Sequence, residues 1–136
     1  MKNVKLIKFK NYHDHDGDLV VIEESTKKVP FSISRVFNVS SSSVGSIRGK
    51  HAHKLCTQLL ICTNGSLEVF CDNLFEKKHF SLNRPDVGLI ISSGVWAEQK
   101  YLAENTVLTV LCDRPYEKHD YIHDYEEFKD FIQKVK

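Results

Sequence analysis

Two histidines stand one residue apart, His51 and His53, in a segment whose residue types are those of a β-strand. Side chains alternate across a strand, so the two imidazoles are predicted to face the same side. Imidazole pairs of this kind bind a metal ion or transfer protons, because an unperturbed histidine titrates near neutral pH. We therefore expect the chemistry of the protein, metal-dependent or acid–base, to take place at this strand.

Arg35 is the second unusual side chain, because residues 31–39 alternate with period two and place it on an apolar face. Its neighbours on that face are Phe31, Ile33, Phe37 and Val39. Two interpretations remain open. Arg35 extends to solvent or pairs with a core carboxylate, or it binds an anion at the mouth of a barrel.

Short strand-like segments separated by turn residues follow one another from residue 4 to residue 112. This pattern, without a helical period, predicts an all-β sandwich or barrel. Residues 13–18 are expected to form a turn and residues 19–23 a buried strand. Asn64-Gly65 is expected to be the turn of a β-hairpin.

Helical spacing appears only in residues 124–135, where Asp124 stands at the N-cap position. Apolar side chains recur there at the spacing of one helix face, namely Tyr125, Phe128, Ile132 and Val135. We expect this face to dock on the barrel or on a partner subunit. No domain boundary is visible, so residues 1–136 are predicted to form a single domain.

The composition argues against several classes of protein. The 136 residues carry a formal net charge of +1 and no long basic run, which disfavours a nucleic-acid partner. No apolar stretch approaches the roughly 20 residues of a membrane span, and the N-terminal residues lack the apolar region of a signal peptide. The four cysteines form no C-x-x-C pair and are predicted to be reduced core thiols, so the expected location is the cytoplasm.

The spacing around the histidines resembles the first motif of the cupins, and the matching positions are Gly45, His51, His53, Gln58 and Gly65. Cupins normally carry glutamate where Gln58 stands. Their second motif resembles residues 92–97, and its metal-binding histidine corresponds to Ala97. Two of four usual ligands are absent, and two histidines alone seldom hold Zn²⁺ or Fe²⁺. We expect a metal-free cupin double-stranded β-helix (a jelly-roll barrel) with a short C-terminal α-helix, whose histidines transfer protons.

Over nearly its whole length the chain resembles the dTDP-4-keto-6-deoxyglucose 3,4-ketoisomerases, which are small cupins. The matching pieces are Asp14-x-x-Gly17-x-Leu19 with Glu23, Pro30-Phe31-Ser-Ile-x-Arg35-Val36, Arg48-Gly49-x-His51-Ala52-His53-Lys54, Gln58 with Leu60-Ile61-Cys62 and Gly65-Ser66, Val95-Trp96, and Tyr116 with Asp120-Tyr121-Ile122 and Tyr125. The chain departs from the family at Asp16, at Ala97 and at Phe37-Asn38, where relatives often carry a tyrosine pair suited to relaying protons.

This resemblance implies an enzyme that moves the ketone of a dTDP-4-keto-6-deoxyhexose from C4 to C3 through an enediol, without a cofactor or a metal. It implies that His51 is the base at C3 and that His53 protonates or steadies the enediolate. The substrate-binding residues that it implies are Arg48, Arg35, Gln58, Trp96 and Tyr121. It further implies a homodimer with the N-terminal strands in the interface, and a product destined for a dTDP-linked 3-amino-3,6-dideoxyhexose of surface glycans.

Several placements remain open. If the strand already includes residue 48, Arg48 points to the face opposite His51. Otherwise Arg48 lies in a loop and reaches the diphosphate or a neighbouring subunit. Trp96 stacks on the sugar or base, or it fills the core. The tail residues Tyr116, Asp120 and Tyr121 are expected to form a structural cap after the last strand.

Three other functions are compatible with parts of this pattern. A nucleotide-sugar 3,5-epimerase shares the barrel and the proton chemistry, but it needs a group for C5, and no His–Asp dyad is visible. A non-catalytic cupin that binds a sugar nucleotide would keep only the pocket. A metal-dependent cupin would recruit further ligands such as His79, His13 or Glu98. The C4 configuration of the product, galacto or gluco, is not encoded in any residue pattern.

Overall fold

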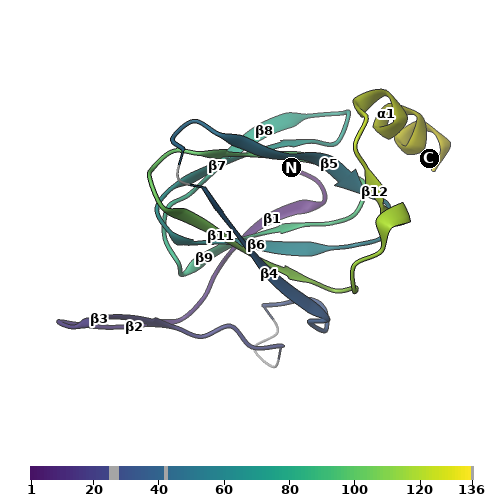
Figure 1. Ribbon diagram of the computed structural model, residues 1–136. Helices are drawn as coiled ribbons and strands as arrows, with labels where there is room; N and C mark the ends of the chain where they lie inside the picture. Colours follow the sequence, from purple (N-terminus) through teal and green to yellow (C-terminus); the bar gives the residue numbers. More distant parts are fainter. Residues whose placement is uncertain (25–27, 42, 136) are drawn as a thin grey trace.

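The computed structural model describes residues 1–24, 28–41 and 43–135. In this part of the chain two five-stranded antiparallel sheets face each other (Figure 1). The first contains, in spatial order, β1 (Val4–Lys8), β9 (Val87–Ile91), β6 (Gln58–Asn64), β11 (Thr106–Cys112) and β4 (Arg35–Ser41). The second contains β12 (Tyr121–Ile122), β5 (Ile47–His53), β10 (Trp96–Tyr101), β7 (Leu67–Asp72) and β8 (Lys77–Leu82). The predicted jelly-roll architecture is confirmed.

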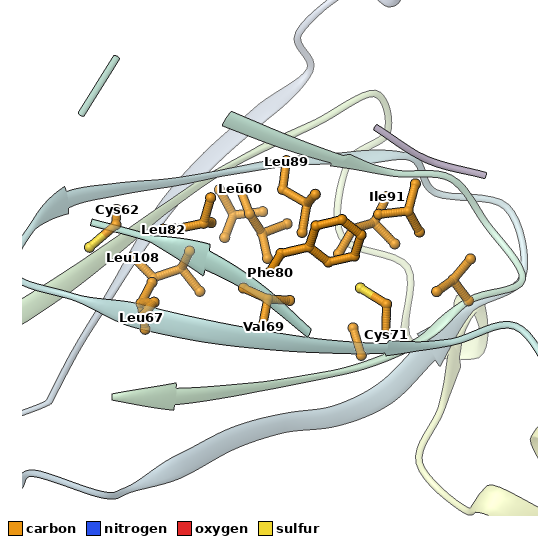
Figure 2. Close-up of a cluster of buried hydrophobic side chains, with 14 of the residues drawn as sticks. Leu60, Cys62, Leu67, Val69, Cys71, Phe80, Leu82, Leu89, Ile91 and Leu108 are labelled. Atoms are coloured by element: carbon orange, nitrogen blue, oxygen red, sulfur yellow. The ribbon is translucent and has the colours of Figure 1, made fainter. Parts of the chain in front are cut away.

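Apolar side chains from alternate strand positions fill the space between the sheets (Figure 2). Leu60, Leu89 and Ile91 project inward from the first sheet, and Val69 and Phe80 from the second. Burying a side chain of this size stabilises the fold by roughly 1.5–3 kcal/mol. All four cysteines are buried and free, in agreement with the prediction of core thiols.

Strand β6 is buried on both of its faces, which explains its uninterrupted apolar run. Leu60 faces the interior, while Leu59 and Ile61 face outward. A second apolar cluster covers the outer face of the sheet, and it includes Phe31 and Ile33. The prediction that these two residues share a face with Phe37 and Val39 is therefore wrong, because β4 begins only at Arg35.

The Asn64-Gly65 turn is present, and Gly65 has a φ of 87°. It does not form a hairpin, because the strands on either side of it, β6 and β7, belong to different sheets. The turn instead carries the chain from one layer of the jelly roll to the other. The prediction of a hairpin at this position is wrong, although the sequence located the turn itself.

The N-terminal ribbon also differs from expectation. Within the described ranges, strands β2 (Asn11–Asp14) and β3 (Gly17–Val20) pair only with each other, and they extend away from the barrel (Figure 1). Residues 19–23 were predicted to be a buried strand, but β3 ends at Val20 and the Leu19 side chain is 61% exposed. The apolar run misleads because no sheet covers this ribbon. The predicted turn at 13–18 narrows to residues 15–16.

Helix α1 (Tyr125–Lys134) begins as predicted at Asp124, whose side chain accepts a hydrogen bond from the Glu127 amide at 3.2 Å. A short 3₁₀ turn, η2 (Lys118–Asp120), precedes it in the chain. Phe128 and Ile132 are buried against the barrel, whereas Val135 is 63% exposed. The helix therefore docks on its own barrel. Among the described residues, no helix has the length and apolar character needed to cross a bilayer.

Candidate active site

A pocket of about 220 Å³ opens between the two sheets, with walls formed by strands of both. It brings together five residues that the sequence analysis selected, namely Arg35, Arg48, His51, Gln58 and Tyr121. Apolar side chains complete the lining, among them Phe37, Leu60, Leu108 and Val110. Sites that enclose a drug-sized ligand typically measure ~300–1,000 Å³. This pocket is therefore smaller than a typical site that encloses a whole drug-sized ligand.

A β-bulge at Gly49 and Lys50 sets which side chains enter the pocket. His51 pairs with Ala97, and Gly49 pairs with the next residue of β10, so Lys50 is an extra residue in β5. Both bulge residues have positive φ, 88° for Gly49 and 52° for Lys50. The extra residue changes the alternation of the strand, so Arg48 lines the same pocket as His51. Arg48 therefore lies in the strand and, because of the bulge, faces the same side as His51.

His51 is held in one tautomer by the bulge. Its Nδ1 lies 2.9 Å from the carbonyl oxygen of Gly49. A carbonyl only accepts, so Nδ1 carries the hydrogen and Nε2 keeps its lone pair. Burial, reinforced by the neighbouring imidazoles of His53 and His123, lowers the pKa of His51 to about 4. The ring is therefore neutral near pH 7 and has the electronic form of a base.

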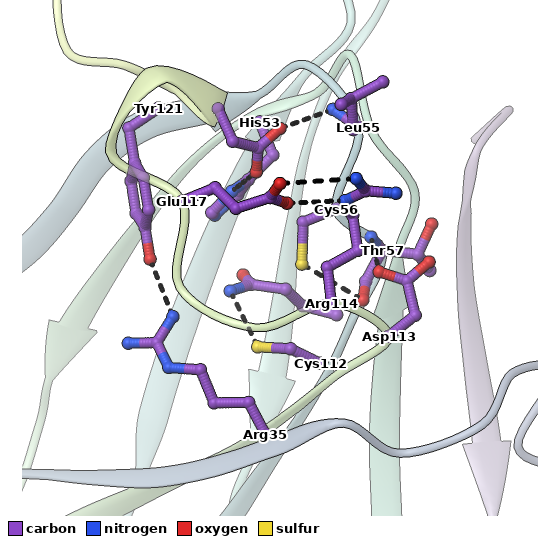
Figure 3. Close-up of polar contacts among 12 residues, drawn as sticks. Arg35, His53, Leu55, Cys56, Thr57, Cys112, Asp113, Arg114, Glu117 and Tyr121 are labelled. Atoms are coloured by element: carbon purple, nitrogen blue, oxygen red, sulfur yellow. Dashed lines mark hydrogen bonds and ion pairs between the residues drawn. The ribbon is translucent and has the colours of Figure 1, made fainter.

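His53 is anchored by Asp120. The Nδ1 of His53 donates to Oδ2 of Asp120 at 2.8 Å, and the Leu55 amide donates to Oδ1 at 2.6 Å (Figure 3). Burial lowers the pKa of His53 despite this carboxylate. Burial alone would raise the pKa of Asp120, but the hydrogen bonds from His53 and Leu55 outweigh it and hold that pKa below its ordinary value. The pair is a buried imidazole–carboxylate dyad.

The two histidine rings meet edge to face, with centroids 5.0 Å apart, as expected for residues on one strand face. Only His51 lines the pocket, whereas His53 lies behind it and is 7% exposed. The Nε2 of His53 is buried without a hydrogen-bond partner among the described residues. Direct contact of both imidazoles with one substrate was expected, and the geometry assigns that contact to His51.

The tail after the last strand supplies part of the site. Tyr121 pairs with His53 in the register of β12 and β5, and its ring centroid lies 4.4 Å from that of His53. Asp120, expected to be only part of a structural cap, holds His53 instead. No His–Asp dyad for proton transfer at C5 was visible in the sequence, and the dyad found here does not supply that group, because neither of its residues lines the pocket. The two residues lie 67 positions apart, so only the pairing of β12 with β5 reveals them.

Arg35 contacts aromatic rings and a phenol rather than a core carboxylate. Its Nη1 donates to the hydroxyl of Tyr121 at 3.1 Å (Figure 3), and the guanidinium lies 4.5 Å from the centre of the Phe37 ring. This location at the pocket agrees with the anion-binding interpretation. Gln58 is also at the pocket, where its Nε2 lies 3.5 Å from the sulfur of Cys112.

Trp96 lies outside the pocket. It is 5% exposed and packs against Phe128 and Tyr125 of helix α1. Its Nε1 donates to Oε2 of Glu98 at 2.9 Å. The residue alternates with Ala97, so it points to the outer face of β10, where the helix covers it. The structure does not bring Trp96 together with the other predicted substrate-binding residues.

The additional metal ligands considered above are dispersed. His79 faces Glu68 at 3.2 Å, His13 faces Asp18 at 2.6 Å, and Glu98 accepts from the tryptophan described above. Ala97, opposite His51 in the neighbouring strand, offers no ligand atom. The residues around His51 therefore do not fit a four-ligand cupin metal site. A separate buried cluster of His53, Cys56 and Asp120 has its ligand atoms within 4.8 Å of one another.

Known proteins resemble this chain in both sequence and fold. The family model described as "FdtA: WxcM-like, C-terminal" matches residues 2–133. A TDP-4-oxo-6-deoxy-alpha-D-glucose-3,4-oxoisomerase of Aneurinibacillus thermoaerophilus is 40% identical over 131 residues, which are 96% of this chain and 94% of that protein. The crystal structure of the sugar 3,4-ketoisomerase QdtA from Thermoanaerobacterium thermosaccharolyticum, in complex with TDP, has a TM-score of 0.92 and 40% identity, covering 99% of this chain and 98% of that one. A mutant of QdtA in complex with TDP-4-keto-6-deoxyglucose has a TM-score of 0.91 and 39% identity, covering 98% and 96%.

Proposed function

We propose that this chain, which belongs to the FdtA family of WxcM-like C-terminal domains, is a sugar-nucleotide 3,4-ketoisomerase that converts TDP-4-keto-6-deoxyglucose into its 3-keto isomer. The activity of relatives 40% identical over nearly the whole chain supports the substrate class. The observation that carries the proposal is the state of His51. It is a neutral imidazole whose Nδ1–H is tied to the Gly49 carbonyl and whose Nε2 is free at the pocket.

Isomerisation begins with removal of the proton at C3, next to the C4 ketone. The Nε2 of His51 takes this proton, and the electron pair of the C–H bond forms the enediolate. Arg35 and Arg48 contribute positive charge at the pocket, where it stabilises the developing oxyanion or binds the diphosphate. Protonation of C4 then gives the 3-keto sugar. The apolar lining, including Phe37 and Leu60, keeps water from the enediolate.

The His53–Asp120 dyad positions the base. The edge of one imidazole packs against the face of the other at a centroid separation of 5.0 Å, so fixing the His53 ring also restricts the orientation of His51. Asp120 keeps the hydrogen of His53 on Nδ1, which leaves its Nε2 as an acceptor. His53 thus holds the His51 imidazole in one orientation and does not itself line the pocket.

A homodimer is part of this proposal. The ribbon β2–β3 pairs with no other strand in the described part of the chain, and it exposes Tyr12 (52%) and Leu19 (61%). Unpaired strand edges and exposed apolar side chains are suited to association with a second copy. We place this ribbon in the dimer interface. Light scattering at working concentration that shows only monomer would contradict this assignment.

The biological setting proposed is the cytoplasm, where the 3-keto product is the substrate for amine transfer to C3. That step gives a dTDP-linked 3-amino-3,6-dideoxyhexose for surface glycans. The chemistry supports this order, because an amine condenses with a ketone, and the isomerisation places the ketone at C3.

The test compares the wild-type protein with His51→Asn, using TDP-4-keto-6-deoxyglucose as substrate and TDP as the binding probe. Asparagine keeps a polar side chain but has no basic nitrogen. Turnover should fall by at least ~100-fold, the lower range for loss of a general base, while TDP affinity changes little. Binding of TDP by an inactive wild-type protein would instead identify a non-catalytic cupin. An unchanged rate in the variant would remove His51 from the mechanism.

A further inference from the structure

The isomerisation needs a second proton-transfer group besides His51. Moving a ketone from C4 to C3 transfers one hydrogen between carbons and also adds one to O4 and removes one from O3. The inference below rests on the proposed function and names the group that serves the two oxygens. In β4 the side chain at position 37 that faces the pocket is phenylalanine, which has no proton to give.

Among the residues that the structure describes, two hydroxyl groups line the pocket, those of Tyr101 and Tyr121. The hydroxyl of Tyr101 donates to the carbonyl oxygen of Val39 at 3.3 Å, so its proton is engaged. The hydroxyl of Tyr121 accepts from Nη1 of Arg35 at 3.1 Å. A guanidinium only donates hydrogen bonds, so the hydroxyl hydrogen of Tyr121 must point away from Arg35. Among the described residues this hydrogen has no acceptor.

Tyr121 is also held in place relative to the base. Strand β12 pairs with β5, and the aromatic ring of Tyr121 lies 4.4 Å from His53 and 5.2 Å from His51, measured between centroids. Arg35 is fixed in turn between the rings of Phe37 and Tyr116, at 4.5 and 5.2 Å. The guanidinium therefore lies within hydrogen-bond distance of the phenol oxygen, where its charge would offset negative charge that develops on that atom during the reaction.

We infer that Tyr121, paired with Arg35, is the acid–base residue that exchanges protons with O4 and O3 of the sugar while His51 serves C3 and C4. As His51 takes the C3 proton, the C–H electron pair forms the C3–C4 double bond. The π pair of the ketone then binds the proton of the Tyr121 hydroxyl at O4. The Tyr121 phenolate next takes the O3 proton, and that O–H pair forms the new ketone. The enediol π pair accepts the proton of the His51 imidazolium at C4, so both residues regain their starting states.

Other groups near the base are less suited to this task. His53 already donates its Nδ1 hydrogen to Asp120, and its Nε2 is buried behind the pocket wall. His123 stacks on Tyr121 at 5.6 Å and is exposed, but it does not line the pocket. Of the side chains in the described part of the chain, Tyr121 is the one that combines a hydroxyl hydrogen without an acceptor, a location in the pocket wall and an adjacent cation.

The test begins with Tyr121→Phe, which removes one oxygen and keeps the ring that packs on His53. We expect kcat for TDP-4-keto-6-deoxyglucose to fall by at least ~100-fold, as is typical for loss of an acid–base group, with TDP affinity within about threefold of wild type. Tyr12→Phe is the matched control. Tyr12 lies on β2, outside the pocket lining, and is 52% exposed, so the same substitution there should change kcat less than about threefold.

A double-mutant cycle with Arg35→Met separates the pair from an independent role of the arginine in binding. If Arg35 acts on kcat through the Tyr121 hydroxyl, the double variant should retain kcat within about threefold of Tyr121→Phe alone. Thermal unfolding of each variant identifies any that are misfolded. In such a case Arg35→Lys, which keeps the charge, should recover most of the kcat lost in Arg35→Met.

Two results would overturn the inference. One is a Tyr121→Phe variant whose kcat stays within threefold of wild type. The other is a double variant in which the separate effects of Tyr121→Phe and Arg35→Met on kcat multiply. Both differ from failure of the proposed function, in which the wild-type protein itself forms no 3-keto product. In that event the inference falls together with the function on which it rests.

Discussion

Asp120→Asn tests how the buried dyad contributes to stability and to catalysis. The carboxylate accepts from His53 Nδ1 at 2.8 Å and from the Leu55 amide at 2.6 Å. An asparagine keeps an acceptor for Leu55 but presents an NH₂ group to His53. The imidazole must then accept at Nδ1 and carry its hydrogen on Nε2, which is buried without a partner.

The magnitude follows from these contacts. A hydrogen bond to a charged group contributes roughly 1.5–3 kcal/mol and a neutral one about 0.5–1.5, so making both bonds neutral should cost about 2–3 kcal/mol. For a chain of this length that lowers Tm by roughly 7–10 °C. Asp120→Ala should cost more, about 2–6 kcal/mol, because two buried donors then lose their acceptor at ~1–3 kcal/mol each.

The assay is thermal unfolding at neutral pH together with kcat at saturating TDP-4-keto-6-deoxyglucose. Because His53 restricts the orientation of the base, kcat of Asp120→Asn should fall by ~10–100-fold, as for other residues that orient a functional imidazole. Asp113→Asn is the matched control. That carboxylate accepts from the backbone amide of Thr57 at 3.0 Å and is not part of the pocket lining, so its variant should keep kcat within about threefold. An Asp120→Asn variant with wild-type Tm and kcat would refute the positioning role of the dyad.

Three further predictions concern the bulge, the helix face and the base. Gly49→Ala should destabilise the protein by at least ~1 kcal/mol more than Gly45→Ala in denaturant unfolding. Both glycines have a φ of 88°, but only at Gly49 would the new Cβ lie 2.4 Å from the Gln99 side chain. Equal losses of stability in the two variants would contradict this steric reason. Trp96→Phe should lower Tm yet keep kcat within about threefold, since the indole packs under helix α1, and a large loss of kcat would restore its substrate-binding role. Burial lowers the pKa of His51 from 6.5 to about 4, so between these two pH values the unfolded chain binds a proton that the folded protein does not. Up to about 3 kcal/mol of stability should therefore be lost as the pH falls from 6.5 to 4. Over the same range kcat/KM should stay level and decline only near pH 4, and a midpoint near 6.5 in the pH–rate profile would show that the base is solvated.

The sequence was informative where alternation alone decides the geometry. His51 and His53 share a strand face because their spacing of two residues is independent of the rest of the fold. Arg48 could not be placed in the same way. Its direction depends on the bulge at Lys50, a residue type that rarely adopts the φ of 52° seen here.

Long-range pairing was the other source of error. Asp120 reaches His53 only because β12 adds to the edge of β5, and no local pattern encodes that pairing. The run Leu19–Glu23 has the composition of a buried strand, but β2 and β3 form a separate ribbon that leaves Leu19 exposed. Trp96 matched a family motif, yet its parity in β10 directs it to the helix rather than to the pocket.

The most direct test of the central claim is proton NMR of the purified protein with TDP-4-keto-6-deoxyglucose in D₂O. A new 3-keto sugar should form, and its C4 should carry the hydrogen that His51 removed from C3, replaced by deuterium only to the extent that the imidazolium exchanges with solvent before returning it. In the fraction that keeps hydrogen at C4, the coupling constants of the ring protons give the C4 configuration. Deuterium at C3 and C5 with the ketone still at C4 would instead indicate a 3,5-epimerase. Absence of both exchange and product would contradict the assignment of His51 as the base at C3.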